Sequence, residues 1–247
     1  MNYLTAAILG VVQGITEFLP ISSSAHLVFV QHLLPGFTQT GVFFDVMLHV
    51  ATTVAVLIYF RKTLLLITPR QLLLLAIGSI PAAIAGVVFR EEFELLFSSV
   101  FWAGITLAMS GVLNLFVDRA KTDRTKVGVL DAICIGIAQA VAIIPGISRS
   151  GATIFIGTFL GVERKKVAEF TFLLSIPAIL GASVVQVLSH GFATNGATLE
   201  YLFGAVVAGV TAYFSIGFLL STLTSKRYSY FGYYAIVVGL LTAFFLK

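Results

Sequence analysis

Two short polar segments interrupt long apolar stretches of this chain: QGITEFLPISSSAHL at residues 13–27 and PGISRSGAT at residues 145–153. An apolar run precedes each segment and a short apolar stretch follows it: residues 3–19 and 25–34 around the first, and residues 128–144 and 152–160 around the second. Ten helical residues extend about 15 Å, which is half the hydrocarbon thickness of a membrane. The pattern therefore predicts two re-entrant hairpins, each a helix, a polar break and a half-length helix. Such breaks are tolerated at membrane depth only where protein buries them or water reaches them.

The composition places the chain in a membrane. Of its 247 residues, 58% are apolar and 11% are charged, whereas a soluble domain carries roughly 25% charged residues. The single cysteine excludes a disulfide scaffold, and the apolar content excludes a disordered chain. The net charge of +4 comes from basic residues in short loops, which is typical of membrane orientation signals. We therefore expect membrane lipid, and no nucleic acid, as a partner.

Six further segments are long enough to cross a membrane, which takes about 20 apolar residues. They are residues 42–60, 71–89, 101–117, 168–188, 199–221 and 230–246. Together with the hairpins they predict an all-α polytopic membrane protein, in which residues 1–247 form a single membrane domain.

The two hairpins are similar in sequence. A shift of 126 positions gives 7 identities over the 25 residues 6–30, where composition alone predicts roughly two. The identical pairs are Ala6 with Ala132, Gly10 with Gly136, Gln13 with Gln139, Ile21 with Ile147, Ser22 with Ser148, Ser24 with Ser150 and Phe29 with Phe155. The same shift pairs Gly78 with Gly204. The sequence thus predicts two repeats, residues 1–122 and 123–247, each a hairpin and three spans. An odd number of crossings in each predicts that the second repeat is inverted.

The basic residues support this inverted repeat. If each hairpin returns to its own side, one side of the membrane receives the loops at 61–70, 118–126, 161–166 and 222–229. These loops hold 12 of the 15 basic residues: Arg61, Lys62, Arg70, Arg119, Lys121, Arg124, Lys126, Arg164, Lys165, Lys166, Lys226 and Arg227. The opposite side receives only Arg90 and Lys247. The positive-inside rule predicts that the basic loops are cytoplasmic and both termini are outside. The two breaks then meet near the middle of the membrane.

Each break places serine hydroxyls and free backbone N–H groups at the start of a half-length helix, which predicts an anion-binding site. Arg149 lies at membrane depth, and its planar guanidinium suits capture of phosphate or carboxylate. The structural alternative is that the serines are ordinary helix caps and that Arg149 only pairs with Glu17. An ionisable residue inside a membrane favours the functional interpretation.

Gln13 and Glu17 are four residues apart, so they lie on one helix face beside the first break. A carboxylate beside an anion site repels the anion. A divalent cation, Mg²⁺ or Ca²⁺, that bridges Glu17 to phosphate oxygens would remove this repulsion. Direct general-base catalysis by Glu17 is the second option.

His26 lies three residues after Ser23, close enough to approach the same bound group. The two can act as base and nucleophile, or His26 can attack phosphorus itself, and capping or packing of His26 is the structural alternative. We favour Ser23 over His26 as the attacking group, with attack by activated water as a third route. Asp45 and His49 are also four residues apart, and a structural polar pair explains them at least as well as a catalytic one.

Taken together, these motifs resemble the undecaprenyl-diphosphatase family, also called bacitracin-resistance proteins. Residues 13–27 are similar to the family pattern (E/Q)xxxE followed by PxSSxxHL, and residues 145–153 are similar to PGxSRSGxT. The similarity covers essentially the whole chain. Gln13 takes a position that is Glu in many members, and Ser24-Ala25 stands where Thr-Gly is common.

The resemblance implies an integral membrane hydrolase of the bacterial inner membrane that removes the terminal phosphate of undecaprenyl diphosphate. It implies that the protein recycles the lipid carrier for cell-wall synthesis and confers bacitracin resistance, with Mg²⁺ or Ca²⁺ as cofactor and a site open to the outer face. The candidate site residues are, for catalysis, Glu17, Ser23, His26 and Arg149; for substrate binding, Ser22, Ser24, Ser148, Ser150 and Thr153; and for the metal, Glu17 and Gln13.

A transporter or lipid flippase is the competing class, because inverted repeats alone favour it. A structural membrane subunit is a third. The combination of Ser, His, Glu and Arg at the breaks favours the enzyme, since it is more reactive than binding requires. Flipping in addition to hydrolysis stays open. The sequence does not distinguish a monomer from a homodimer.

Overall fold

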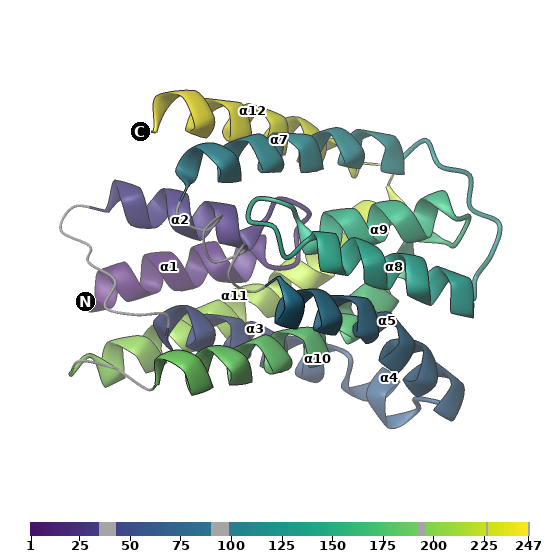
Figure 1. Cartoon of the computed structure of the whole chain (residues 1–247), viewed down its shortest axis with the longest axis horizontal. Coiled ribbons are helices and arrows are strands. Elements are labelled where there is room, and N and C mark those ends of the chain that lie inside the picture. Colours follow the sequence, from purple (N-terminus) through teal and green to yellow (C-terminus); the bar gives the residue numbers. More distant parts are fainter. Residues whose placement is uncertain (35–42, 90–98, 192–195, 226, 247) are drawn as a thin grey trace.

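The computed structural model describes residues 1–34, 43–89, 99–191, 196–225 and 227–246 (Figure 1). The helices are α1 (Tyr3–Thr16), α2 (Ser23–Leu33), α3 (Phe43–Tyr59), α4 (Arg61–Leu65), α5 (Pro69–Val88), α7 (Val100–Val117), α8 (Val129–Val141), α9 (Arg149–Phe159), α10 (Arg164–His190), α11 (Thr198–Thr224) and α12 (Ser229–Phe245). Apart from one isolated β-bridge between Arg124 and Val162, all regular structure in these residues is helical. The predicted all-α class is confirmed.

The helix lengths and the distribution of apolar side chains are those of a polytopic membrane protein. Four helices, α5, α7, α10 and α11, are long and apolar enough to cross a membrane. The other two predicted spans, α3 and α12, have 17 residues each, which is about 26 Å at the helical rise. Large apolar side chains such as Val87 and Phe214 face outward with 75% and 69% exposed, whereas Gln13 and Asn114 are fully buried. A polar interior inside an apolar surface is stable in lipid and not in water.

Both hairpins are present, and their breaks lie in the middle of the molecule (Figure 1). Each half-length helix begins two or three residues earlier than predicted, at Ser23 and at Arg149. The reason is helix capping, because the hydroxyls of Ser22 and Ser148 accept the backbone N–H groups of Ala25 and Gly151. Ser23 and Arg149 are therefore the first residues of their helices and not part of the preceding loop.

A polar face of α7 supports both breaks. Thr106, Ser110 and Asn114 are spaced four residues apart on this helix. Asn114 donates to the carbonyl of Pro20 at 2.7 Å, Ser110 accepts from the backbone N–H of Ser148 at 3.1 Å, and Thr106 donates to a carbonyl of the second break at 2.5 Å. These contacts satisfy backbone groups that no helix pairs, which a chain in lipid requires.

The two halves pack across each other. In Figure 1, α1 begins at the left and α8 begins at the right; α1 packs on α11, and α8 packs on α5. A Cβ atom on Gly10 would collide with the carbonyl of Gly204, and one on Gly136 would collide with that of Gly78. These are the glycines that the 126-residue shift pairs. Equivalent close contacts thus hold each hairpin against the other half, although the inverted orientation in a membrane stays a prediction.

The described parts of the four basic segments gather at one end of the molecule, and both chain termini lie at the other (Figure 1). Two of these predicted loops are partly helical, because α4 begins at Arg61 and α10 begins at Arg164. The Arg164 guanidinium donates to the carbonyls of Val117 and Asp118, and the Asp118 carboxylate accepts the backbone N–H of Ser229. Thr63 and Lys165 line one cavity at this end. The loops are therefore grouped as the charge pattern requires. Which side of the membrane they face stays a prediction.

Candidate active site

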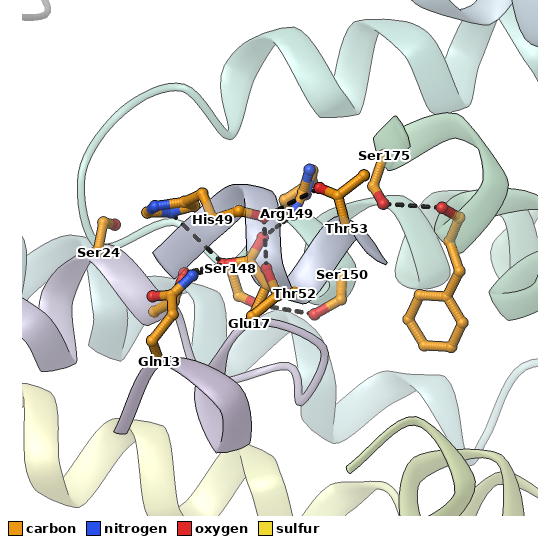
Figure 2. Close-up of polar contacts among 12 residues, drawn as sticks. Gln13, Glu17, Ser24, His49, Thr52, Thr53, Ser148, Arg149, Ser150 and Ser175 are labelled. Carbon is orange, nitrogen blue, oxygen red and sulfur yellow. Dashed lines mark hydrogen bonds and ion pairs between the residues drawn. The ribbon is translucent and has the colours of Figure 1, made fainter. Parts of the chain in front are cut away.

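The site is built around the carboxylate of Glu17, the residue at which α1 ends, and this side chain is 2% exposed. One carboxylate oxygen, Oε2, accepts from the Ser23 hydroxyl at 2.5 Å and from the Gln13 amide at 2.9 Å. The His49 Nε2 atom lies 3.6 Å from the same oxygen. The other oxygen, Oε1, is bound by the Arg149 guanidinium. Figure 2 shows Gln13, His49 and Arg149 converging on Glu17.

The two breaks contribute equivalent positions to this cluster. Ser23 and Arg149 are each the first residue of a half-length helix, they are related by the 126-residue shift, and both contact Glu17. The breaks also touch directly, because the Ser150 hydroxyl donates to the Leu19 carbonyl at 3.1 Å and the Ser24 hydroxyl accepts from Gly146 N–H at 3.5 Å. Residues far apart in the sequence therefore meet where two helix N-termini, with their partial positive charge, lie close together.

Not all of the predicted substrate-binding residues are equally accessible. The side chains of Arg149 and His49 are 18% and 30% exposed, and Ser23 and Ser24 are partly exposed. Four other candidates are buried: Ser22, Ser148, Ser150 and Thr153. Their hydroxyls bond to neighbouring serines, helix N–H groups or backbone carbonyls. In this arrangement they shape the two helix starts, and Arg149, Ser23 and Ser24 are the groups that an anion can reach.

Both ring nitrogens of His26 have partners other than Ser23 and Glu17. Its ring Nδ1 is 2.8 Å from the Ser22 carbonyl, and its Nε2 is 2.9 Å from the hydroxyl of Tyr234 on α12. The predicted pairing of Ser23 with His26 as its base is not present in this arrangement, because the Ser23 hydroxyl donates to Glu17 instead. The catalytic role of His26 stays a prediction.

The structure adds His49 to the site. Its Nδ1 bonds to the Asp45 carbonyl at 2.8 Å within α3, which aims Nε2 at Glu17. The four-residue spacing of Asp45 and His49 was compatible with a structural pair at least as well as with a catalytic one. The available signal was that His49 is an ionisable residue inside a predicted span, which favours a functional role. The sequence contained no indication of which helix it would face.

Comparison with known proteins agrees with the motifs at the two breaks. The family model described as bacitracin resistance protein BacA matches residues 6–241. The chain belongs to this family. An undecaprenyl-diphosphatase of Syntrophotalea carbinolica is 40% identical over 255 residues, covering 97% of both chains. Those of Carboxydothermus hydrogenoformans and Methanobrevibacter smithii are 40% and 35% identical, covering 97% and 98% of this chain and 95% and 96% of their own.

The resemblance implies a divalent cation for this BacA family member, with Glu17 and Gln13 as the candidate ligands. Within the described residues, no three His, Cys, Asp or Glu side chains gather as a metal site. The Gln13 Oε1 atom, however, is buried without a hydrogen-bond partner beside Glu17. One carboxylate and one amide oxygen suit Mg²⁺ or Ca²⁺ when a substrate phosphate and water complete the ligands. The site therefore fits a cation that is bound together with the phosphate.

Proposed function

We propose that this chain is an undecaprenyl-diphosphatase, which hydrolyses undecaprenyl diphosphate to undecaprenyl phosphate and inorganic phosphate. The observation that carries the proposal is that Ser23 and Arg149, from two separate breaks, contact one buried carboxylate, Glu17, and yet stay partly exposed, so that an anion can reach them. In a protein of the BacA family, this cluster combines a phosphate-binding cation, a hydroxyl and a base within an apolar molecule.

Arg149 supplies the principal phosphate contact. Its guanidinium carries five N–H donors in a planar fork, so it can bind phosphoryl oxygens while it keeps one bond to Glu17. The N-termini of α2 and α9 and the hydroxyl of Ser24 add neutral donors. The polyprenyl chain of the substrate lies among the exposed apolar side chains, in the lipid.

Ser23 is our first choice for the attacking group. Its oxygen attacks the terminal phosphorus while Glu17 accepts the hydroxyl proton along the existing hydrogen bond. The bond between that phosphorus and the bridging oxygen breaks, and undecaprenyl phosphate leaves. Water then hydrolyses the phosphoserine, which releases inorganic phosphate and restores the hydroxyl. Arg149 stabilises the charge on the phosphoryl oxygens during transfer.

A divalent cation, Mg²⁺ or Ca²⁺, would be held by Glu17 and Gln13 together with phosphate oxygens. When bound, it neutralises negative charge on the diphosphate. This role accounts for a carboxylate beside an anion site and for the unpartnered Gln13 oxygen.

We place the protein in the bacterial inner membrane, with the termini and the opening of the site on the outer face. There it returns the lipid carrier to peptidoglycan synthesis. It also confers bacitracin resistance, because bacitracin captures the diphosphate form of the carrier. The residues of the cluster all come from one chain, so the proposal does not require a homodimer.

Phosphate release from undecaprenyl diphosphate by the purified protein in detergent tests this proposal, because a pure flippase releases none. Trapping then identifies the attacking group. Acid-stable phosphate on Ser23 supports our first choice, and an acid-labile, base-stable adduct on His26 replaces it. If no adduct forms and Ser23→Ala keeps near-normal turnover, the attacking group is water.

A further inference from the structure

Ser22, directly before the candidate nucleophile, has an unusual backbone conformation. Its φ is 65° and its ψ is 105°, and it is the one non-glycine residue with positive φ in the described part of the chain. Positive φ is unfavourable for residues with a Cβ atom, and such residues persist only where surrounding contacts hold them. The first break therefore needs an external restraint exactly one residue before Ser23.

His26 provides contacts to this residue. Its backbone N–H donates to the Ser22 carbonyl at 3.3 Å, and its ring Nδ1 lies 2.8 Å from the same oxygen. A carbonyl oxygen only accepts, so Nδ1 carries the proton. In the neutral ring, Nε2 then has a lone pair and accepts the hydroxyl proton of Tyr234 at 2.9 Å.

Tyr234 fixes the orientation of this ring from the other half of the chain. It lies on α12, 208 residues from His26, and the two rings are nearly parallel, at 10°, with centroids 5.7 Å apart. Turning the imidazole over would break both hydrogen bonds at once. The contacts therefore form one series, from Tyr234 to His26, to the Ser22 carbonyl and to the turn that carries Ser23.

We infer that Tyr234 is a positioning residue: acting through His26, it holds the strained turn at Ser22 and so presents the Ser23 hydroxyl to Glu17. The inference rests on the proposed phosphatase activity and assigns His26 a role that does not require it to touch the phosphate. Tyr234 belongs to neither sequence motif, and only its contact with His26 identifies it.

Tyr234→Phe tests the inference because it removes the hydroxyl and keeps the stacked ring. We expect kcat to fall about 2- to 10-fold with little change in KM, which is the effect of one lost hydrogen bond. Tyr233→Phe, on the same helix with its side chain 58% exposed, is the matched control and should keep wild-type kcat. A Tyr234→Phe protein indistinguishable from this control overturns the inference.

Combining Tyr234→Phe with Ser22→Gly separates a positioning role of Tyr234 from a general loss of protein structure. Glycine adopts positive φ without a steric penalty, so in Ser22→Gly the turn needs less restraint. Ser22→Gly also removes the hydroxyl that caps α2, so the effect of Tyr234→Phe is measured relative to the Ser22→Gly single variant. We expect the kcat loss from Tyr234→Phe to shrink to less than about 2-fold there, since the backbone strain that the His26 contacts oppose is then absent. An undiminished loss contradicts the link through Ser22.

Nitrogen NMR of protein labelled with ¹⁵N-histidine tests the contact without any activity. The chain has four histidines, and His26→Gln assigns the resonance. We expect a protonated Nδ1 and a hydrogen-bonded Nε2 whose shift changes in Tyr234→Phe and not in Tyr233→Phe. An unchanged shift overturns the inference. If the wild-type protein releases no phosphate, the proposed function fails while this measurement still decides whether Tyr234 holds His26.

Discussion

Replacing Arg149 by Lys keeps the positive charge at the site and removes the planar fork. In the structure one guanidinium nitrogen, Nη2, is bound to Glu17. Its other donors have no hydrogen bond to the described residues, so they can hold phosphoryl oxygens. An ammonium is a point charge that cannot hold the carboxylate and two phosphate oxygens in this geometry. Losing one charge-assisted hydrogen bond costs about 1.5–3 kcal/mol, so we expect kcat/KM to fall about 10- to 150-fold.

The fold should survive this change. The Glu17 side chain is 2% exposed, and a lysine at position 149 still offers it a cation. Arg149→Ala, in contrast, leaves the carboxylate buried without its charge partner, which costs about 3–5 kcal/mol of stability. Thermal unfolding in detergent therefore separates the two variants, with only the alanine protein strongly destabilised.

Arg124→Lys is the matched control for lost bidentate geometry. Arg124 binds both carboxylate oxygens of Asp131 at 2.9 Å, but in a basic loop at the end of the molecule. Phosphate release from undecaprenyl diphosphate, measured over a range of substrate concentrations, should be near normal for this variant. If Arg149→Lys retains the kcat/KM of Arg124→Lys, Arg149 does not bind the phosphate as proposed.

Three further predictions follow from the site, the charge pattern and the packing. Glu17→Gln should lower the rate and the dependence on Mg²⁺ or Ca²⁺ together, and full wild-type activity in excess chelator would remove the metal role. In intact cells, an impermeant thiol reagent should label a cysteine at position 90 and not one at position 121, and the reverse pattern contradicts the predicted orientation. Gly136→Ala should lower the unfolding temperature because its Cβ meets the Gly78 carbonyl, whereas Gly181→Ala, with nothing within 4 Å, should not.

Much of the architecture follows from local composition. Long apolar runs dictate helices, since a backbone in lipid must satisfy its own hydrogen bonds. Proline and serine residues at the two breaks mark where those helices stop. The structure has both breaks, but each begins three residues earlier than predicted, because α1 ends at Thr16 and α8 at Val141. Because a charged side chain inside a membrane is costly, the sequence also indicated Glu17 and Arg149 as candidate site residues. The two side chains are in contact.

Helix starts were less predictable, because they depend on capping geometry. Ser23 and Arg149 belong to helices and not to loops, since the preceding serines accept their first-turn N–H groups. The polar face of α7 was not predicted, although Thr106, Ser110 and Asn114 are spaced four residues apart. Such a spacing indicates one helix face but not the groups that the face contacts. Asn114 binds a carbonyl 94 residues away, and such a contact depends on how two helices cross.

The sequence by itself determined the membrane class, the two hairpins, the grouping of basic loops and the residue types that suit a phosphate. Tertiary structure alone decided which side chains meet: Ser23 with Glu17 and not with His26, His49 with Glu17, and His26 with Tyr234. The physical reason is that periodicity indicates the face of a helix on which a side chain lies. The neighbour on that face is set by packing between distant segments, here through close glycine contacts that no local pattern specifies.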